Sequence, residues 1–159
     1  MKKVLLILSM FALFGCADQQ IPLPQHVVNL TPPTNVKVGY IKLVQNANYY
    51  VDTNSIWVDN EDNGQVHFDA VINLDKGLYV YPDPRRYARS VRQYKILNCN
   101  NYRLTQVRTD FYDDYWGEGL RAAPKHQKKY TLRLQPNSSL YTLGQIICVN
   151  NETRILSKK

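Results

Sequence analysis

The chain has 159 residues, a formal net charge of +7 and three cysteines. That length provides for one small domain, and the odd number of cysteines excludes complete pairing within the chain. The positive charge makes nucleic acid the first partner to consider, because lysine and arginine neutralise phosphates. Whether that partner is available depends on where the chain resides, which its N-terminus indicates.

Residues 1–15 have the pattern of a secretory signal. Two lysines precede an apolar run, VLLILSMFALF, which is too short for the roughly 20 residues of a membrane-spanning helix. The following LFGC resembles a bacterial lipobox and predicts cleavage before Cys16 and acylation of that cysteine; an ordinary cleaved signal is the alternative. Ala17, in place of an aspartate, favours sorting to the outer membrane. Because nucleic acids are scarce outside the cytoplasm, we expect no nucleic-acid partner.

Acylation of Cys16 would leave Cys99 and Cys148 as the remaining cysteines. In an oxidising compartment these two can form a disulfide that closes a loop of about 50 residues and contributes about 4 kcal/mol. Two buried reduced thiols are the alternative. The spacing fits neither a CxxC redox pair nor a zinc site.

Residues 16–38 are expected to form the lipidated cysteine and an extended tether. The segment contains four prolines and shows no sustained periodicity, which is typical of a linker. The folded domain is expected at residues 39–159.

Alternation with a period of two dominates that domain. In VHFDAVINL, residues 66–74, apolar side chains alternate with polar ones, which predicts a half-buried strand with His67 on its polar face. Turn residues separate the other candidate strands. We expect strands at 39–44, 48–51, 55–58 and 130–134, a hairpin turn at 75–77 leading into LYVY, and a turn at 98–101 between KIL and YRLTQVRTDFY.

Residues 135–150 change to helical spacing. Leu140, Leu143, Ile146 and Ile147 recur on one face, and Ser138 or Ser139 can serve as the N-cap. A disulfide from Cys99 to Cys148 would attach this helix to the sheet. The predicted fold is α+β, with an antiparallel β-sheet of about six strands and one C-terminal α-helix covering a face.

Charge is segregated along the chain. Residues 84–108 include seven basic side chains and no acidic one, and arginine and tyrosine are enriched at protein interfaces. The segment therefore predicts a ligand-binding surface, although a solvated face is the simpler alternative. The candidate ligand-binding residues are Arg85, Arg86, Tyr87, Arg89, Arg92, Lys95, Arg103 and Arg108.

Local periodicity suggests how these side chains are displayed. If residues 85–89 form a strand, Arg85, Tyr87 and Arg89 share one face, and Tyr87 is an exposed anchor between two guanidinium groups. Tyr79 and Tyr94 are expected to pack against the sheet instead.

No catalytic motif is present. The chain lacks a nucleophile elbow, HExxH, a phosphate-binding glycine loop and paired His or Cys ligands. Asp113, Asp114 and Glu118 could form a carboxylate pair, but they lie in a glycine-containing segment that is more typical of a turn. We expect no enzymatic activity, no metal and no cofactor; haem ligation by a tyrosine or histidine is an alternative for which no pair is singled out.

Three segments closely resemble the surface-adhesin protein E family of bacterial outer-membrane lipoproteins. They are GYIKLVQNANYYVDTNSIWVDN, HFDAVINLDKGLYVYPDPRRYARSVRQYKILNC and QVRTDFYDDYWGEGLRAAPK. The resemblance extends from about residue 31 to 148. It implies a six-stranded antiparallel sheet, a helix held by a Cys99–Cys148 disulfide, and a homodimer.

The resemblance also implies a function: binding of host vitronectin, laminin and plasminogen, which aids adhesion and complement resistance. In the family, the segment matching residues 84–108 binds vitronectin and laminin, with a Lys-Arg pair where this chain has Arg85 and Arg86. Arginine keeps the charge at the first position but changes its geometry. The region matching residues 41–68 is associated with laminin and plasminogen, and its acidic balance suits lysine-binding modules.

A second hypothesis comes from charge alone. The basic, tyrosine-rich face could bind polyanions such as lipopolysaccharide or heparin, with host-protein contacts incidental. Affinity for a polyanion should follow the total charge, whereas a shaped protein interface should depend on particular side chains.

Overall fold

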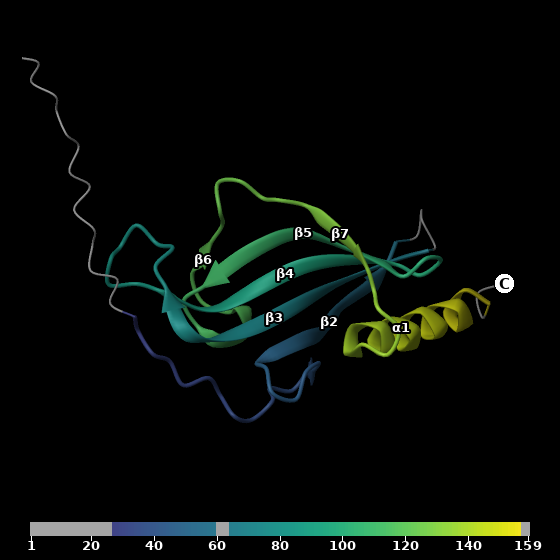
Figure 1. Ribbon diagram of the computed structural model, residues 1–159, viewed down its shortest axis with the longest axis horizontal. Coiled ribbons are helices and arrows are strands. Elements are labelled where there is room, and N and C mark those ends of the chain that lie inside the picture. The colour runs from purple at the N-terminus through teal and green to yellow at the C-terminus, as the bar shows by residue number, and fades with distance from the viewer. Residues whose placement is uncertain (1–26, 60–63, 157–159) are drawn as a thin grey trace, which may run out of the picture.

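The computed structural model describes residues 27–59 and 64–156 (Figure 1). Cys16 and the predicted signal lie outside the described residues. The strands are β1 (Tyr40–Lys42), β2 (Tyr49–Val58), β3 (Gln65–Leu78), β4 (Ala88–Asn98), β5 (Arg103–Tyr112), β6 (Arg121–Ala122) and β7 (Tyr130–Arg133), followed by helix α1 (Ser139–Leu156).

The strands form one antiparallel sheet in the order β1-β2-β3-β4-β5-β6, with β7 also paired to β5. Strands β6 and β7 occupy the same edge, because β6 pairs with the end of β5 and β7 with its beginning. The sheet therefore has six strand positions across its width. The predicted fold, an antiparallel sheet of about six strands with one C-terminal helix, is confirmed.

Two turn predictions were wrong. The expected break between 48–51 and 55–58 is a β-bulge within β2, where the pairing register with β3 shifts between Asp52 and Trp57.

The expected hairpin turn at 75–77 lies inside β3, because residues 28–30 pair with it. Leu30 donates its N–H to the Asp75 carbonyl, and Gly77 donates to the Val28 carbonyl, each at 2.8 Å. Part of the predicted tether is thus attached to the domain.

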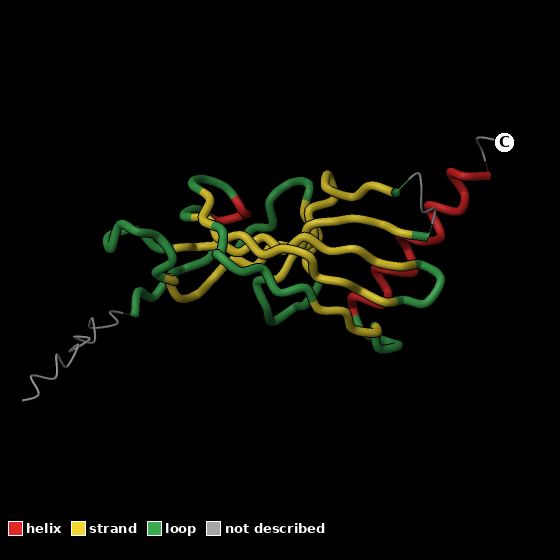
Figure 2. Tube along the Cα trace, turned by 90° about the horizontal axis from the view of Figure 1, so that it is seen from above, coloured by secondary structure: helices red, strands yellow, loops and turns green. Residues whose placement is uncertain are grey.

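The hydrophobic core lies between α1 and one end of one sheet face. Figure 2 shows the helix running along the strands at that end only. Ser138 is the N-cap, since its Oγ accepts the Tyr141 N–H at 3.2 Å. The core residues are Leu43, Val51, Val66, Phe68, Leu97, Leu104, Leu134, Leu143, Ile147 and Cys148. Of the predicted apolar helix face, Ile146 is instead exposed.

A disulfide joins Cys99 to Cys148, with Cα atoms 5.7 Å apart. Cys99 follows directly after β4, in a turn that matches the one predicted at 98–101. Asn98 Oδ1 closes that turn by accepting the N–H groups of Asn100 and Asn101 at 3.0 and 3.2 Å. The disulfide therefore attaches α1 to the end of β4 that lies away from the β3–β4 connection.

The opposite face of the sheet is also partly covered. His67, expected on a polar face, is buried there: its ring stacks on Trp57 with centroids 3.8 Å apart, and Nδ1 lies 2.7 Å from the Tyr94 hydroxyl. Further along this face, buried Trp116 contacts the rings of Tyr40 and Tyr50. No helix formed by the described residues is long and apolar enough to cross a membrane.

Candidate functional site

The basic loop, residues 79–87, connects β3 to β4 at the end of the sheet away from α1 (Figure 1). Its shape comes from the sequence Pro82-Asp83-Pro84. Asp83 Oδ1 accepts the Arg85 N–H at 2.9 Å, and the Asp83 carbonyl accepts the Arg86 N–H at 3.0 Å, which closes an Asx-type turn. Two hydrogen bonds lower the pKa of Asp83: the larger effect comes from the backbone N–H of Arg85, and the smaller one from the Arg85 side chain. The aspartate therefore stays ionised and holds the turn.

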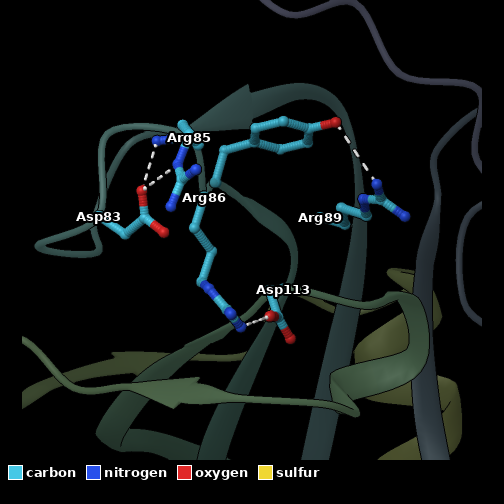
Figure 3. A pocket seen from close by; sticks show the side chains of 6 residues that line it. Asp83, Arg85, Arg86, Arg89 and Asp113 are labelled. Carbon is cyan, nitrogen blue, oxygen red and sulfur yellow. Dashed lines mark hydrogen bonds and ion pairs between the residues drawn. The ribbon is translucent and has the colours of Figure 1, made fainter.

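An open cavity of about 430 Å³ lies against the basic loop. Figure 3 shows Arg85 turned toward Asp83 and Arg86 reaching across to Asp113. Arg85 Nε is 3.3 Å from Asp83 Oδ1, and Arg86 Nη1 donates to Asp113 Oδ2. The cavity is lined by Asp83, Arg85, Arg86, Tyr87, Arg89 and Asp113.

Tyr87 does not have the predicted geometry. Residues 85–87 precede β4 and form no strand, so the expected alternation of Arg85, Tyr87 and Arg89 does not apply. Tyr87 is half-buried, and its ring packs edge-on against Tyr79 with centroids 6.1 Å apart. Arg89 lies over the same ring at 5.4 Å and donates to the Tyr87 hydroxyl at 3.4 Å. Tyr87 thus orients Arg89 beside the cavity.

The far wall of the cavity belongs to the Trp116 loop, residues 113–120. Asp113 Oδ1 accepts the Leu120 N–H at 2.6 Å, which leaves Oδ2 directed at Arg86. The Tyr81 hydroxyl donates to the Leu120 carbonyl at 2.6 Å and so links the two loops. Burial raises the pKa of Tyr81 to about 12, and the tyrosine therefore remains a hydrogen-bond donor at physiological pH.

Contacts from the sheet hold the Trp116 loop in place. The side chain of Trp116 is buried although its backbone is left-handed, with φ of +66°. Asn73 Oδ1 accepts the Trp116 N–H at 2.9 Å. Ser90 Oγ donates to the Asp114 carbonyl at 2.5 Å and accepts the Gly117 N–H at 2.9 Å. Asp113 is thereby positioned by a rigid part of the domain.

Arg92, a predicted ligand-binding residue, belongs to this support. Its Nη1 lies 2.9 Å from Asp52 Oδ2 and 2.8 Å from Asp69 Oδ2, and its side chain is only 19% exposed. Nη2 donates to the Trp116 carbonyl at 3.3 Å. Although burial opposes the charge, the two carboxylates raise the pKa of Arg92 overall. Its guanidinium is committed to contacts within the fold.

Lys95 lies on the other face of the sheet, the one that α1 covers in part. The residue is 4% exposed, and Nζ donates to Gln106 Oε1 at 3.0 Å. The Tyr130 hydroxyl donates to the same oxygen at 2.7 Å. Burial lowers the pKa of Lys95 to about 8. Lys95 is not among the residues that line the cavity.

The last two candidates lie on β5. Arg108 pairs with buried Asp110, which also binds Arg121: the Nε atoms lie 3.0 and 2.8 Å from Asp110 Oδ2. Arg103 lines a smaller cavity of about 180 Å³ with polar residues of β3, β4 and β7. Of the eight predicted residues, four therefore line the 430 Å³ cavity: Arg85, Arg86, Tyr87 and Arg89.

Sequence reasoning did not place the two aspartates of the cavity in the binding surface, although it named Asp113 as part of a possible carboxylate pair. Asp83 stands between two prolines, a pattern that indicates a side-chain-capped turn. Asp113 is 27 residues from Arg86 and carries no local signal for their pairing. Within the part of the chain that the structure describes, no group of three or more His, Cys, Asp or Glu side chains is placed to hold a metal ion.

Comparisons with known proteins point to one family. A family model described as surface-adhesin protein E matches residues 37–149. The chain is 65% identical over 150 residues to surface-adhesin protein E of Haemophilus influenzae strain NTHi 3655, covering 94% of each chain. It is 64% identical, with the same coverage, to the protein of that name from strain Rd of the same species.

Solved structures agree. A crystal structure of protein E from non-typeable Haemophilus influenzae superposes with a TM-score of 0.76 at 69% identity, covering 81% of this chain and 88% of that one. A second structure of Haemophilus influenzae protein E gives a TM-score of 0.74 at 70% identity, covering 79% and 95%.

Proposed function

The chain belongs to the surface-adhesin protein E family, and from that premise we propose that it is a non-enzymatic adhesin that binds host vitronectin, laminin and plasminogen. Such binding would aid adhesion and complement resistance. The observation that supports it most directly is the cavity at one end of the sheet, which is lined by Arg85, Arg86, Tyr87 and Arg89. Arginine and tyrosine dominate the binding energy of many protein interfaces.

We propose that the contact residues are those at the cavity. Arg85 and Arg86 project from the loop and Arg89 is oriented by Tyr87. Arg92 contributes by supporting the Trp116 loop, whereas the Lys95 side chain is buried inside the domain and makes no contact with that loop. Arg103 and Arg108 of β5 extend the basic surface away from the cavity.

The proposed cellular location is the outer membrane, with the domain on the cell surface and Cys16 as its lipid anchor. Support comes from the lipobox-like LFGC and from Ala17 after it. We also propose a homodimer, as the family resemblance implies. Plasminogen binding is assigned to the region of residues 41–68, whose acidic side chains suit lysine-binding modules.

The first prediction separates a shaped protein-binding site from general charge attraction. We expect Arg85→Ala with Arg86→Ala to weaken vitronectin binding by about tenfold or more, because two interface arginines are lost. Lys128→Ala with Lys129→Ala removes the same charge from exposed residues outside the cavity and should have little effect. Surface plasmon resonance at physiological salt measures both. Equal losses would favour the polyanion hypothesis, with lipopolysaccharide or heparin as ligand.

A further inference from the structure

The charge of the cavity is much more balanced than the charge of the sequence segment that forms it. Residues 84–108 contain seven basic and no acidic side chains. The cavity, in contrast, is lined by three arginines and two aspartates. Asp83 faces Arg85, and Asp113 comes from the opposite wall to face Arg86. An occupant of the cavity would therefore meet both signs of charge within one small space.

The two ion pairs of the cavity can be exchanged at low cost. The side chains of Arg85 and Arg86 are 89% and 43% exposed, and exposed pairs contribute little to stability. An incoming carboxylate can therefore take the place of Asp113 at Arg86. Once Arg86 pairs with the ligand, Asp113 Oδ2 lacks its cation, while Asp113 Oδ1 still accepts the Leu120 N–H.

Hydrogen bonds hold Asp113 on its own wall of the cavity. Leu120 holds its carboxylate, and Trp116 fixes the loop through hydrogen bonds to Asn73 and Arg92. The side chain is 20% exposed, so an unpaired charge there would be partly desolvated and unfavourable. A ligand that supplies a cation to Asp113 as well as an anion to Arg86 satisfies both walls. A dense polyanion satisfies only one and is repelled by the other.

We propose that the cavity recognises a protein segment in which acidic and basic side chains are interleaved, with Asp113 as a contact residue for the basic one. The inference rests on the proposed adhesin function and names the chemistry of its ligand. The acidic side chain of the ligand pairs with Arg86, and its basic side chain pairs with Asp113 Oδ2. Arg89, held by Tyr87, offers a further fixed guanidinium beside them.

The test is Asp113→Asn, which removes the charge but keeps an oxygen for the Leu120 N–H. We expect vitronectin binding to fall by about tenfold, in the same direction as for Arg86→Ala, although the variant is more positively charged. Heparin binding should rise instead. Asp75→Asn is the matched control, because it makes the same charge change at an exposed residue outside both the cavity and the Trp116 loop. It should leave vitronectin binding unchanged, and thermal denaturation confirms that all variants fold.

An increase in vitronectin binding by Asp113→Asn would overturn the inference while leaving the adhesin function intact. Failure of the unaltered protein to bind vitronectin, laminin or plasminogen would overturn the adhesin function instead. In that case immobilised peptides replace the host proteins: an alternating Glu-Lys peptide and an oligoglutamate of equal length. If Asp113→Asn abolishes binding to the alternating Glu-Lys peptide, the result supports a ligand of mixed charge. Preference of the unaltered protein for oligoglutamate, or binding of neither peptide, contradicts it.

Discussion

At the scale of single residues, one basic segment of the sequence contains side chains with different tasks. Arg85 and Arg86 are exposed, Arg92 is enclosed by two carboxylates, and Lys95 is buried and donates to Gln106 Oε1. The difference between Arg92 and Lys95 follows from strand alternation, since they lie on opposite faces of β4. Charge alone therefore does not identify a binding residue, because burial decides whether the charge is available.

Lys95 should reduce stability at neutral pH. Burial lowers its pKa to about 8, against about 10.4 when exposed, which corresponds to about 3 kcal/mol. Below pH 8 the side chain is charged in both the folded and the unfolded state, and the full free-energy cost of burying that charge is present. Between the two pKa values the unfolded chain binds more protons, so the free energy of unfolding rises with pH.

We therefore expect Lys95→Met to raise the free energy of unfolding by about 1–3 kcal/mol at pH 7, the lower end reflecting loss of the bond to Gln106. The gain should shrink by about 1 kcal/mol at pH 9. Urea denaturation at the two pH values measures it, with exposed Lys128→Met as the control. A gain that is independent of pH would show that folded Lys95 keeps its proton up to pH 9, so that burial does not lower its pKa.

At the scale of the elements, β4 connects the two specialised ends of the domain. The basic loop enters it before Ala88, and Cys99, bonded to Cys148 of α1, follows Asn98. The helix packs on the core at the disulfide end only. The cavity is instead supported by the Trp116 loop, through Asn73, Ser90 and Arg92. Stability and binding should consequently depend on different ends of the sheet.

Removing the disulfide tests that separation. The bonded cysteines are 49 residues apart, so Cys99→Ser with Cys148→Ser should lower the free energy of unfolding by about 4 kcal/mol. Denaturant unfolding measures this change. Vitronectin binding by the folded fraction, measured at low temperature, should stay within about twofold of the unaltered protein. A folded double variant that no longer binds would show that the disulfide end shapes the cavity.

At the scale of the whole molecule, the described chain enters the domain beside the basic loop. Val28 and Leu30 bond to Gly77 and Asp75 of β3, close to where the loop begins, whereas α1 lies at the far end (Figure 1). If Cys16 is acylated, residues 17–26 limit the distance between this end and the lipid to about 35 Å. The proposed binding surface would then lie at the end of the domain nearer the membrane.

The anchor itself is tested by Cys16→Ala. We expect the variant to leave the membrane fraction, because several acyl chains on one residue supply the membrane affinity. Immunoblotting of fractionated cells measures this, and labelling of intact cells with an antibody to the domain reports its orientation. Unchanged fractionation would contradict lipidation at Cys16, and an unlabelled surface would contradict the adhesin function.

The sequence by itself determined most of the strands, the helix and the pairing expected of the cysteines. Strand alternation and turn residues act over a few residues, so the strand at 66–74 and the turn at 98–101 were predicted correctly, although His67 is buried. Ser138 was one of the two predicted N-cap residues. The turn expected at 75–77 failed because Val28 and Leu30, more than forty positions away, supply its hydrogen bonds. Local signals could not report that contact.

Only the tertiary structure decided which charged residues form the site. The sequence indicated the basic loop, but burial removed Arg92 and Lys95 from the cavity, and folding brought in Asp113 across 27 positions. Pairing of distant charges depends on the sheet register and on the Trp116 loop, whose backbone needs glycines 117 and 119 at positive φ. The physical reason is that a charge acts through its neighbours in space, and those are set by the whole fold.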